Sequence, residues 1–264
     1  MDIPEKTLFN IVLQGFLAIS LVIAGALMVV GSPYGSQTSY RGRLAINGQT
    51  AWIIMELVSP TTLLCAYLTY ETSIEFMSAS NALVALWLVH YANRAVVYPL
   101  RQPARKPMHI GIMLSAVVFN TVNGYLNGRW LSAFAPAEYH HDLSGFIATH
   151  YLRVPLGLAL FAAGMCGNVI HDNILAGLRR TGSKRRYSIP AGGLFGWVSC
   201  PHFFCEAIEW LGFAVLADSP AAWAFLLNVL CNLVPRAYFI HRWYLATFPD
   251  DYPRTRRAMI PFVL

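Results

Sequence analysis

The chain has 264 residues, of which 56% are hydrophobic and only 12% are charged. A soluble domain of this length carries about twice that share of charged residues, so the composition excludes an ordinary soluble protein. The net charge of +6 does not indicate nucleic acid as a partner, because the basic residues fall between hydrophobic segments. Hydrophobic residues extend along the whole chain, which predicts a single integral membrane domain over residues 1–264.

Seven stretches of the chain are long and apolar enough to span a membrane, since a spanning helix needs about 20 mostly apolar residues. We therefore expect an all-α fold of seven transmembrane helices. The expected spans are Leu8–Val30, Ala51–Tyr70, Ala79–Leu100, His109–Asn127, Gly145–Ile170, Trp197–Ala217 and Ala221–Ala246.

Lysine and arginine alternate between the connecting loops. They gather after the first, third and fifth expected spans and in the tail, whereas the other loops contain almost none. The positive-inside rule then places the N-terminus outside, or in the lumen, and the C-terminus in the cytoplasm. The membrane is expected to be a bacterial inner membrane or the endoplasmic reticulum.

Several of the expected spans contain ionisable or amide side chains, which are costly at bilayer depth unless they face a partner or a wet cavity. Tyr91, Arg94 and Tyr98 follow i, i+3, i+7 spacing and share one helix face. Any single residue of this kind is more often an interhelical hydrogen bond than a ligand contact. As a set they predict one internal cavity. The set is Glu56, His90, Tyr91, Arg94, Asn120, Asn123, Arg153, Asn168, Asp172, Glu206, Glu209, Asn228, Asn232, Arg236 and His241.

The residue types in this set indicate what the cavity binds. Glu56 lies among apolar neighbours with no local cation, so we expect it to be protonated and able to donate a hydrogen bond. Arginines toward the cytoplasmic side suit the phosphates of a dinucleotide. No G-x-G-x-x-G follows a strand, which argues against a Rossmann domain. No metal site is predicted, because the histidines form no HxxH or HxxHH motif and the five cysteines form no CxxC.

An ordered set of motifs resembles the steroid 5α-reductase family, the 3-oxo-5α-steroid 4-dehydrogenases. Residues 90–94 (HYANR) are similar to the family's third-helix motif, and residues 187–195 (YSIPAGGLF) to its cofactor loop. Residues 203–213 (FFCEAIEWLGF) match its F-x-x-E-x-x-E-W-x-G-[YF] stretch, and residues 251–262 (DYPRTRRAMIPF) its tail. The resemblance is strongest over residues 164–264, which it implies are mainly cofactor-binding.

The resemblance implies seven helices, NADPH as the cofactor, and reduction of a Δ4-3-oxosteroid or another enone lipid. By position, Glu56 and Tyr91 would hold the 3-oxo oxygen of the substrate. Met55, His202 and Ile240 depart from the Gln, Asn and His usual in the family, which puts the substrate contacts in doubt. The implied cofactor residues are Ser32, Tyr98, Arg105, Asn168, Asp172, Arg179, Tyr187, His202, Glu206, Arg236, Tyr244 and Arg256.

Two alternatives stay open. Sterol reductases, enoyl reductases and isoprenylcysteine methyltransferases share parts of the C-terminal pattern, and binding of NADPH against S-adenosylmethionine separates the methyltransferase. A lipid-binding or transport protein belongs to a different class, but the sequence contains neither inverted repeats nor helices broken at mid-membrane. The expected partners are the lipid substrate and membrane lipids, without nucleic acid, and the chain is expected to be a monomer.

The orientation can be tested directly. A reporter that is active only in the cytoplasm, fused after Leu264, should be active because the tail contains Arg254, Arg256 and Arg257. The matched control is the same reporter fused to the N-terminus, which should be inactive. Activity of the N-terminal fusion alone would contradict the orientation.

Overall fold

The computed structural model describes residues 4–31, 42–70, 74–103, 105–180 and 187–264, without the side chains of Val30, Arg179 and Arg180. Within these residues the chain is mostly helical, and five helices are long and apolar enough to cross a membrane. The protein is a multi-pass membrane protein. These helices are α1 (Glu5–Val30), α2 (Gly48–Leu68), α5 (Ile110–Arg129), α7 (Arg153–Arg180) and α9 (Pro220–Thr247).

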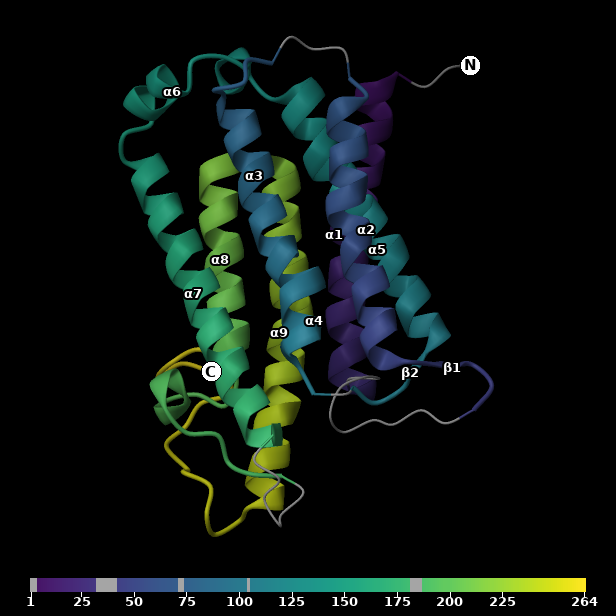
Figure 1. The fold of residues 1–264 in the computed structure, drawn as a ribbon, viewed down its shortest axis with the longest axis vertical. Helices are drawn as coiled ribbons and strands as arrows, with labels where there is room; N and C mark the ends of the chain where they lie inside the picture. Colours follow the sequence, from purple (N-terminus) through teal and green to yellow (C-terminus); the bar gives the residue numbers. More distant parts are fainter. Residues whose placement is uncertain (1–3, 32–41, 71–73, 104, 181–186) are drawn as a thin grey trace.

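Shorter elements complete the bundle in Figure 1. Helix α3 (Ala79–Tyr91) continues through the π-helix η1 (Ala92–Val97) into α4 (Tyr98–Arg101). Helix α8 (Pro201–Ala217) lies beside α7, and the two make one of the most extensive helix contacts of the structure. The expected spans at residues 79–100, 197–217 and 221–246 therefore coincide with helical segments to within a few residues.

The fifth expected span, Gly145–Ile170, is wrong at both ends. Residues 143–149 form a separate short helix, α6 (Leu143–Thr149), and α7 begins only at Arg153. Pro155 lies in the first turn of α7, where a missing backbone N–H leaves no helical hydrogen bond unmade. The helix then continues ten residues beyond Ile170, because side chains such as His171 and Asp172 are buried by contacts with protein.

The π-helix η1 accommodates a proline. Pro99 has no N–H to donate to the carbonyl of Ala95, and its ring would crowd that carbonyl in a regular α-helix. The wider turns of η1 precede Pro99 and relieve this conflict. The Pro99 carbonyl accepts a hydrogen bond of 3.0 Å from Gln49 Nε2 on α2. As a result, η1 and α4 are attached to α2 at the end of the bundle where the tail also lies.

The tail end of the bundle, as we call it, is the end where residues 42–47, 105–109, 187–200 and 248–264 lie (Figure 1). A two-stranded antiparallel ladder joins β1 (Ala45–Ile46) to β2 (Met108–His109) there. Two short 3-10 helices, η3 (Ala137–Tyr139) and η4 (Gly193–Gly196), and the π-helix η2 (Trp130–Phe134) complete the described elements. Helix α6 lies at the opposite end of the bundle.

Aromatic side chains fill the centre of the bundle and attach α3 to α8 and α9. Trp87 is fully buried, and its ring centroid lies 5.1 Å from that of Trp210, 5.3 Å from that of Phe213 and 5.4 Å from that of Phe225. Edge-on ring pairs at this spacing add about 0.5–1.5 kcal/mol beyond the area that they bury. This cluster positions the C-terminal half of α3, which ends at Tyr91, against α8.

Glycine allows α7 and α8 to approach closely. A Cβ added to Gly164 of α7 would lie only 2.6 Å from the Cys205 carbonyl oxygen of α8. A similar approach joins α5 to α2, where a Cβ on Gly124 would lie 2.6 Å from the Ser59 carbonyl oxygen. Small residues at such positions are typical of helix contacts in membranes.

We predict that Gly164→Ala lowers the free energy of unfolding by about 1–3 kcal/mol, because the new methyl group meets backbone that cannot move aside. Thermal melts of the detergent-purified protein measure the effect. The matched control is Gly177→Ala in the same helix, where nothing lies within 4 Å of the added Cβ. Equal melting temperatures for the two variants would contradict the proposed close packing.

Candidate functional site

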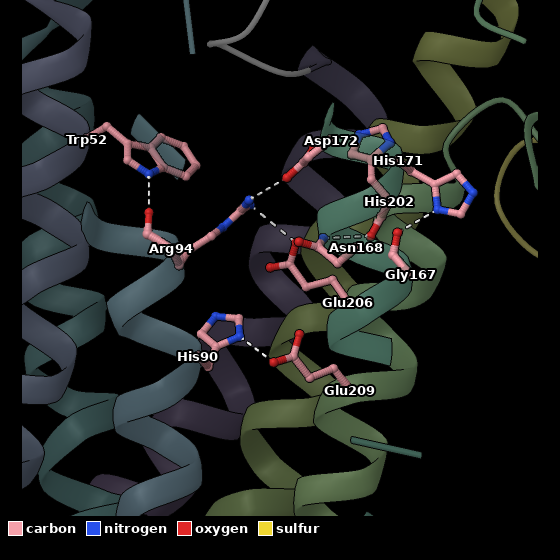
Figure 2. A network of polar contacts seen from close by, with 10 residues as sticks. All are labelled: Trp52, His90, Arg94, Gly167, Asn168, His171, Asp172, His202, Glu206 and Glu209. Carbon is pink, nitrogen blue, oxygen red and sulfur yellow. Dashed lines mark hydrogen bonds and ion pairs between the residues drawn. The ribbon is translucent and has the colours of Figure 1, made fainter. Parts of the chain in front are cut away.

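A buried arginine joins three elements near the tail end. Arg94 of η1 donates from Nη1 to Asp172 Oδ2 on α7 at 3.3 Å and from Nη2 to Glu206 Oε2 on α8 at 3.2 Å. The three side chains are 8–13% exposed. A cation between two carboxylates satisfies charges that would otherwise be unpaired away from water. Figure 2 shows the three side chains converging from their helices.

Aromatic side chains hold Arg94 and a second arginine in place. Trp52 Nε1 on α2 donates to the Arg94 carbonyl at 3.0 Å. The Arg94 guanidinium carbon lies 5.0 Å from the Trp52 ring centroid and 4.9 Å from that of Tyr98. Arg105 lies over the same two rings, at 4.0 Å and 5.0 Å. Two guanidinium groups on one pair of rings form a cationic cluster that cation–π contacts stabilise.

The two residues expected to be catalytic, Glu56 and Tyr91, lie close together. Glu56 on α2 is partly buried and Tyr91 at the end of α3 is 4% exposed. Glu56 interacts electrostatically with Tyr91, Arg94, His90 and Glu206. The acid and the phenol therefore lie within the same polar group as the Arg94 ion pairs, although they are 35 positions apart in the sequence.

A second buried pair of ionisable groups lies one helical turn from Arg94 (Figure 2). His90 Nδ1 is 2.7 Å from Glu209 Oε1, and the two residues are 5% and 1% exposed. The His90 ring also lies 4.9 Å from the Tyr91 ring and 4.4 Å from the Trp210 ring. This contact attaches α3 to α8 next to Tyr91.

Hydrogen bonds connect α7 to the segments before and within α8. Asn168 Nδ2 donates to the His202 carbonyl at 3.0 Å. His171 Nδ1 lies 2.6 Å from the Gly167 carbonyl, while Leu194 N–H donates to His171 Nε2 at 3.0 Å. Because Nε2 accepts, Nδ1 carries the proton and donates, so both ring nitrogens are used. This histidine holds the loop that contains residues 187–195 against α7.

Several further residues of the expected cofactor set lie toward the tail end. Arg256 Nη1 donates to the Pro190 carbonyl at 3.0 Å, which connects the tail to the loop after residue 187. The Tyr187 ring lies 5.0 Å from that of Trp243, and Tyr244 is the neighbour of Trp243 on α9. Arg236 donates to Asn232 on its own helix at 3.2 Å.

The structure thus brings most of the residues expected to be catalytic or to bind the cofactor into two neighbouring groups, whereas Ser32 and the Arg179 side chain lie outside the described residues. The expectation that Arg153 joins the same cavity is wrong, because Arg153 lies at the other end of α7 and donates to Asp218 at 2.9 Å. A small pocket beside the Arg94 group is lined by Asn93, Tyr98 and Asp172, among others. The predicted cofactor set omitted Arg94 and Trp52, although Arg94 is the residue on which the group converges. The i, i+3, i+7 stripe placed Arg94 in the expected cavity set but did not assign it to the cofactor.

We predict that Arg94→Gln lowers the free energy of unfolding by about 3–5 kcal/mol, because two buried carboxylates lose their cation. Adding Asp172→Asn and Glu206→Gln to this variant should recover most of the loss, as shown by thermal melts in detergent. The matched control is Arg242→Gln, whose partner Tyr238 lies on the surface of the same helix; it should have little effect. An Arg94→Gln variant as stable as this control would contradict the role assigned to the ion pairs.

Comparison of the sequence with known proteins identifies the family of this chain. The family model described as 3-oxo-5-alpha-steroid 4-dehydrogenase matches residues 106–264. The chain is 37% identical to steroid 5-alpha-reductase DET2 of Gossypium hirsutum, with 98% of each chain covered. It is 35% identical to 3-oxo-5-alpha-steroid 4-dehydrogenase 1 of Bos taurus over both full chains, and 37% identical to an uncharacterized protein of Schizosaccharomyces pombe, with 90% of this chain and 93% of that protein covered. The chain therefore belongs to the steroid 5α-reductase family of membrane oxidoreductases.

Proposed function

We propose that the protein uses NADPH to reduce the Δ4 double bond of 3-oxo-Δ4 steroids to 5α-reduced 3-oxosteroids. The observation that carries this proposal is the placement of Glu56 beside Tyr91 and the Arg94 ion pairs within the membrane bundle. An acid and a phenol can both donate hydrogen bonds to one carbonyl oxygen. Relatives over the full length of the chain bear the names of enzymes that act on such steroids.

The residues at the tail end fit a dinucleotide phosphate. Among the described residues, Arg256 Nε is buried without a hydrogen-bond partner, while Nη1 of the same group donates to Pro190. A guanidinium has five donors and no acceptor, so an anion can satisfy those that the protein leaves unpaired. The residues proposed to hold the cofactor are Ser32, Tyr98, Arg105, Asn168, Asp172, Arg179, Tyr187, His202, Glu206, Arg236, Tyr244 and Arg256.

When bound, NADPH supplies the hydride that saturates C5 of the enone. Glu56, protonated, and Tyr91 donate hydrogen bonds to the 3-oxo oxygen, which draws electron density from the conjugated double bond. As C5 is reduced, negative charge develops on this oxygen, and the two donors stabilise it in the manner of an oxyanion hole. C4 then takes a proton from water or from a relay. The buried aromatic cluster around Trp87 keeps water away from this end of the substrate.

The proposed topology has seven spans. Residues 79–101 and α8 would cross the membrane together with the five long helices. The two ends of the chain would then lie on opposite sides, and the lysines and arginines of the alternate loops would put the tail end in the cytoplasm. In this orientation the arginines near the tail end face the compartment that supplies NADPH, and the substrate enters from the lipid phase. An even number of spans would place the two ends of the chain on one side.

The activity test is NADPH oxidation by the detergent-purified protein with progesterone or testosterone added. We expect one NADPH consumed for each 5α-reduced product, and faster turnover with NADPH than with NADH, because arginines surround the proposed phosphate sites. Equal use of NADH and NADPH would contradict the phosphate assignment. Binding of S-adenosylmethionine in place of NADPH would favour a methyltransferase.

We predict that Glu56→Ala and Tyr91→Phe each reduce steroid turnover by about 10²-fold, comparable to the loss of one oxyanion-hole donor. Glu56→Gln should retain more activity than Glu56→Ala, because an amide still donates a hydrogen bond. The double variant should lose less than the product of the two single losses, as expected of residues that act together.

NADPH binding should persist in all these variants, since neither residue is assigned to the phosphates, and thermal melts show whether they fold. Thr121→Ala serves as the control, because the exposed Thr121 hydroxyl on α5 donates to the Val117 carbonyl one turn earlier in its own helix. Near-normal turnover by a well-folded Glu56→Ala protein would exclude the proposed role of this acid.

A further inference from the structure

A cluster of three hydroxyl and imidazole groups lies at the tail end, and none of its members is among the residues proposed above to be catalytic or to hold the cofactor. Ser199 Oγ is 2.6 Å from His241 Nδ1 and 2.6 Å from the Tyr252 hydroxyl, and 3.1 Å from the Arg257 carbonyl. Ser199 precedes α8, His241 lies on α9, and Tyr252 belongs to the tail. Ser199 and Tyr252 are each 2% exposed. One serine hydroxyl therefore connects the segment before α8 to α9 and to the tail.

The directions of these hydrogen bonds follow from the donor inventory. Burial raises the pKa of the Tyr252 hydroxyl, so it stays protonated and can donate to Ser199 Oγ. The single Ser199 proton is then free to point to His241 Nδ1 or to the Arg257 carbonyl, both of which can accept. Tyr252 thus gains a buried acceptor that fixes the position of its ring.

The Tyr252 ring contacts two residues of the proposed cofactor site. It stacks on the Tyr244 ring at 5.1 Å with the planes 10° apart, and the Arg256 guanidinium carbon lies 5.2 Å from its centroid. Arg256 in turn reaches the Pro190 carbonyl. The ring, together with the Tyr252 hydroxyl that also interacts with the Arg256 side chain, therefore supports the guanidinium whose Nε lacks a partner among the described residues.

The backbone around this cluster holds the following part of the tail. Arg257 N–H donates to the Trp197 carbonyl and Ser199 N–H to the Arg257 carbonyl, each at 2.8 Å, in a short parallel pairing of residues 197–200 with the tail. Cys200 N–H donates to the Ala258 carbonyl at 3.0 Å. This pairing holds the tail from Arg257 onward. Tyr252 holds the tail on the other side of Arg256, so Arg256 lies between two attached segments.

We propose that Tyr252, anchored through its hydroxyl to Ser199 and His241, is a positioning residue for Arg256 and through it for a phosphate of the cofactor. This proposal rests on the proposed function, because it takes Arg256 as a phosphate ligand. The hydroxyl touches neither substrate nor cofactor. Its effect is to hold one guanidinium in a bound-state position before the anion arrives, which reduces the ordering cost of binding.

A double-mutant cycle in NADPH affinity separates this role from a general structural one. Tyr252→Phe removes only the hydroxyl and should raise the Kd for NADPH by about three- to tenfold, the effect of one hydrogen bond. In an Arg256→Ala background the same change should have less than about a twofold effect, because the residue through which it acts is gone. The KM for the steroid should not change. Equal effects in the two backgrounds would overturn the proposal.

Two further variants test whether the effect of Tyr252→Phe arises from its hydrogen bond to Ser199. Ser199→Ala removes the acceptor and should reproduce the loss seen in Tyr252→Phe, and the pair together should lose no more than either alone. Tyr151→Phe is the matched control, since Tyr151 is 68% exposed near α6 at the opposite end of the bundle. It should leave NADPH affinity unchanged. A Ser199→Ala protein with native affinity would contradict the anchor.

Hydrogen exchange of the cofactor-free protein tests the anchor without any reference to catalysis. Tyr252→Phe should increase exchange of the tail amides, Arg256 and Arg257 among them, while the amides of α5 stay as protected as in the native protein. Unchanged exchange in the tail would overturn the proposal by itself. Absence of NADPH binding by the native protein would instead contradict the proposed function, so the two failures are distinguishable.

Discussion

The arrangement of the bundle depends on Arg94, a buried cation that must find its counter-charges inside the protein. Asp172 on α7 and Glu206 on α8 supply them, at 3.3 Å and 3.2 Å. Inside a membrane bundle, water cannot solvate such a charge, so its counter-charges must come from the protein. Each helix that supplies a carboxylate therefore has both its distance from Arg94 and its rotation about its own axis fixed. The relative positions of η1, α7 and α8 are therefore fixed. Glu56 and Tyr91 lie beside the ion pairs, so their positions depend on the same contacts.

Packing and charge reinforce each other in this arrangement. The glycine contact at Gly164 brings α7 within backbone distance of α8, which is why Asp172 and Glu206 can face the same guanidinium. The edge-on rings around Trp87 attach α3 to the same helix, and the His90–Glu209 pair repeats the attachment one turn from Arg94. All three contacts involve the stretch of α8 between Cys205 and Phe213, so the loss of any one of them would weaken the alignment that the other two share.

The sequence allowed the helices with continuous apolar runs to be predicted to within a few residues, as at α1, α2, α5 and α9. It did not reveal the break before Arg153, because His150-Tyr151-Leu152 is apolar enough to resemble the interior of a span. The family motifs indicated most of the candidate site. They did not indicate which carboxylates pair with Arg94, since that depends on how three helices are rotated against one another. The sequence did not indicate the anchor at Tyr252 either, because Ser199 precedes its two partners, His241 and Tyr252, by 42 and 53 positions.

The π-helical turns of η1 have a consequence for how this chain tolerates changes in length. A π-helix contains more residues per turn than an α-helix, so the loss of one residue between Ala92 and Val97 would let the segment close into regular α-helix. Tyr91 and Tyr98 would then be joined by six α-helical steps of about 100° in place of seven steps that are smaller within η1, so Tyr98 would keep nearly its present direction toward Trp52. A single-codon deletion within η1 would therefore preserve the contacts on either side of it, whereas the same deletion within the regular helix of α3 would turn every later residue of that helix by about 100°.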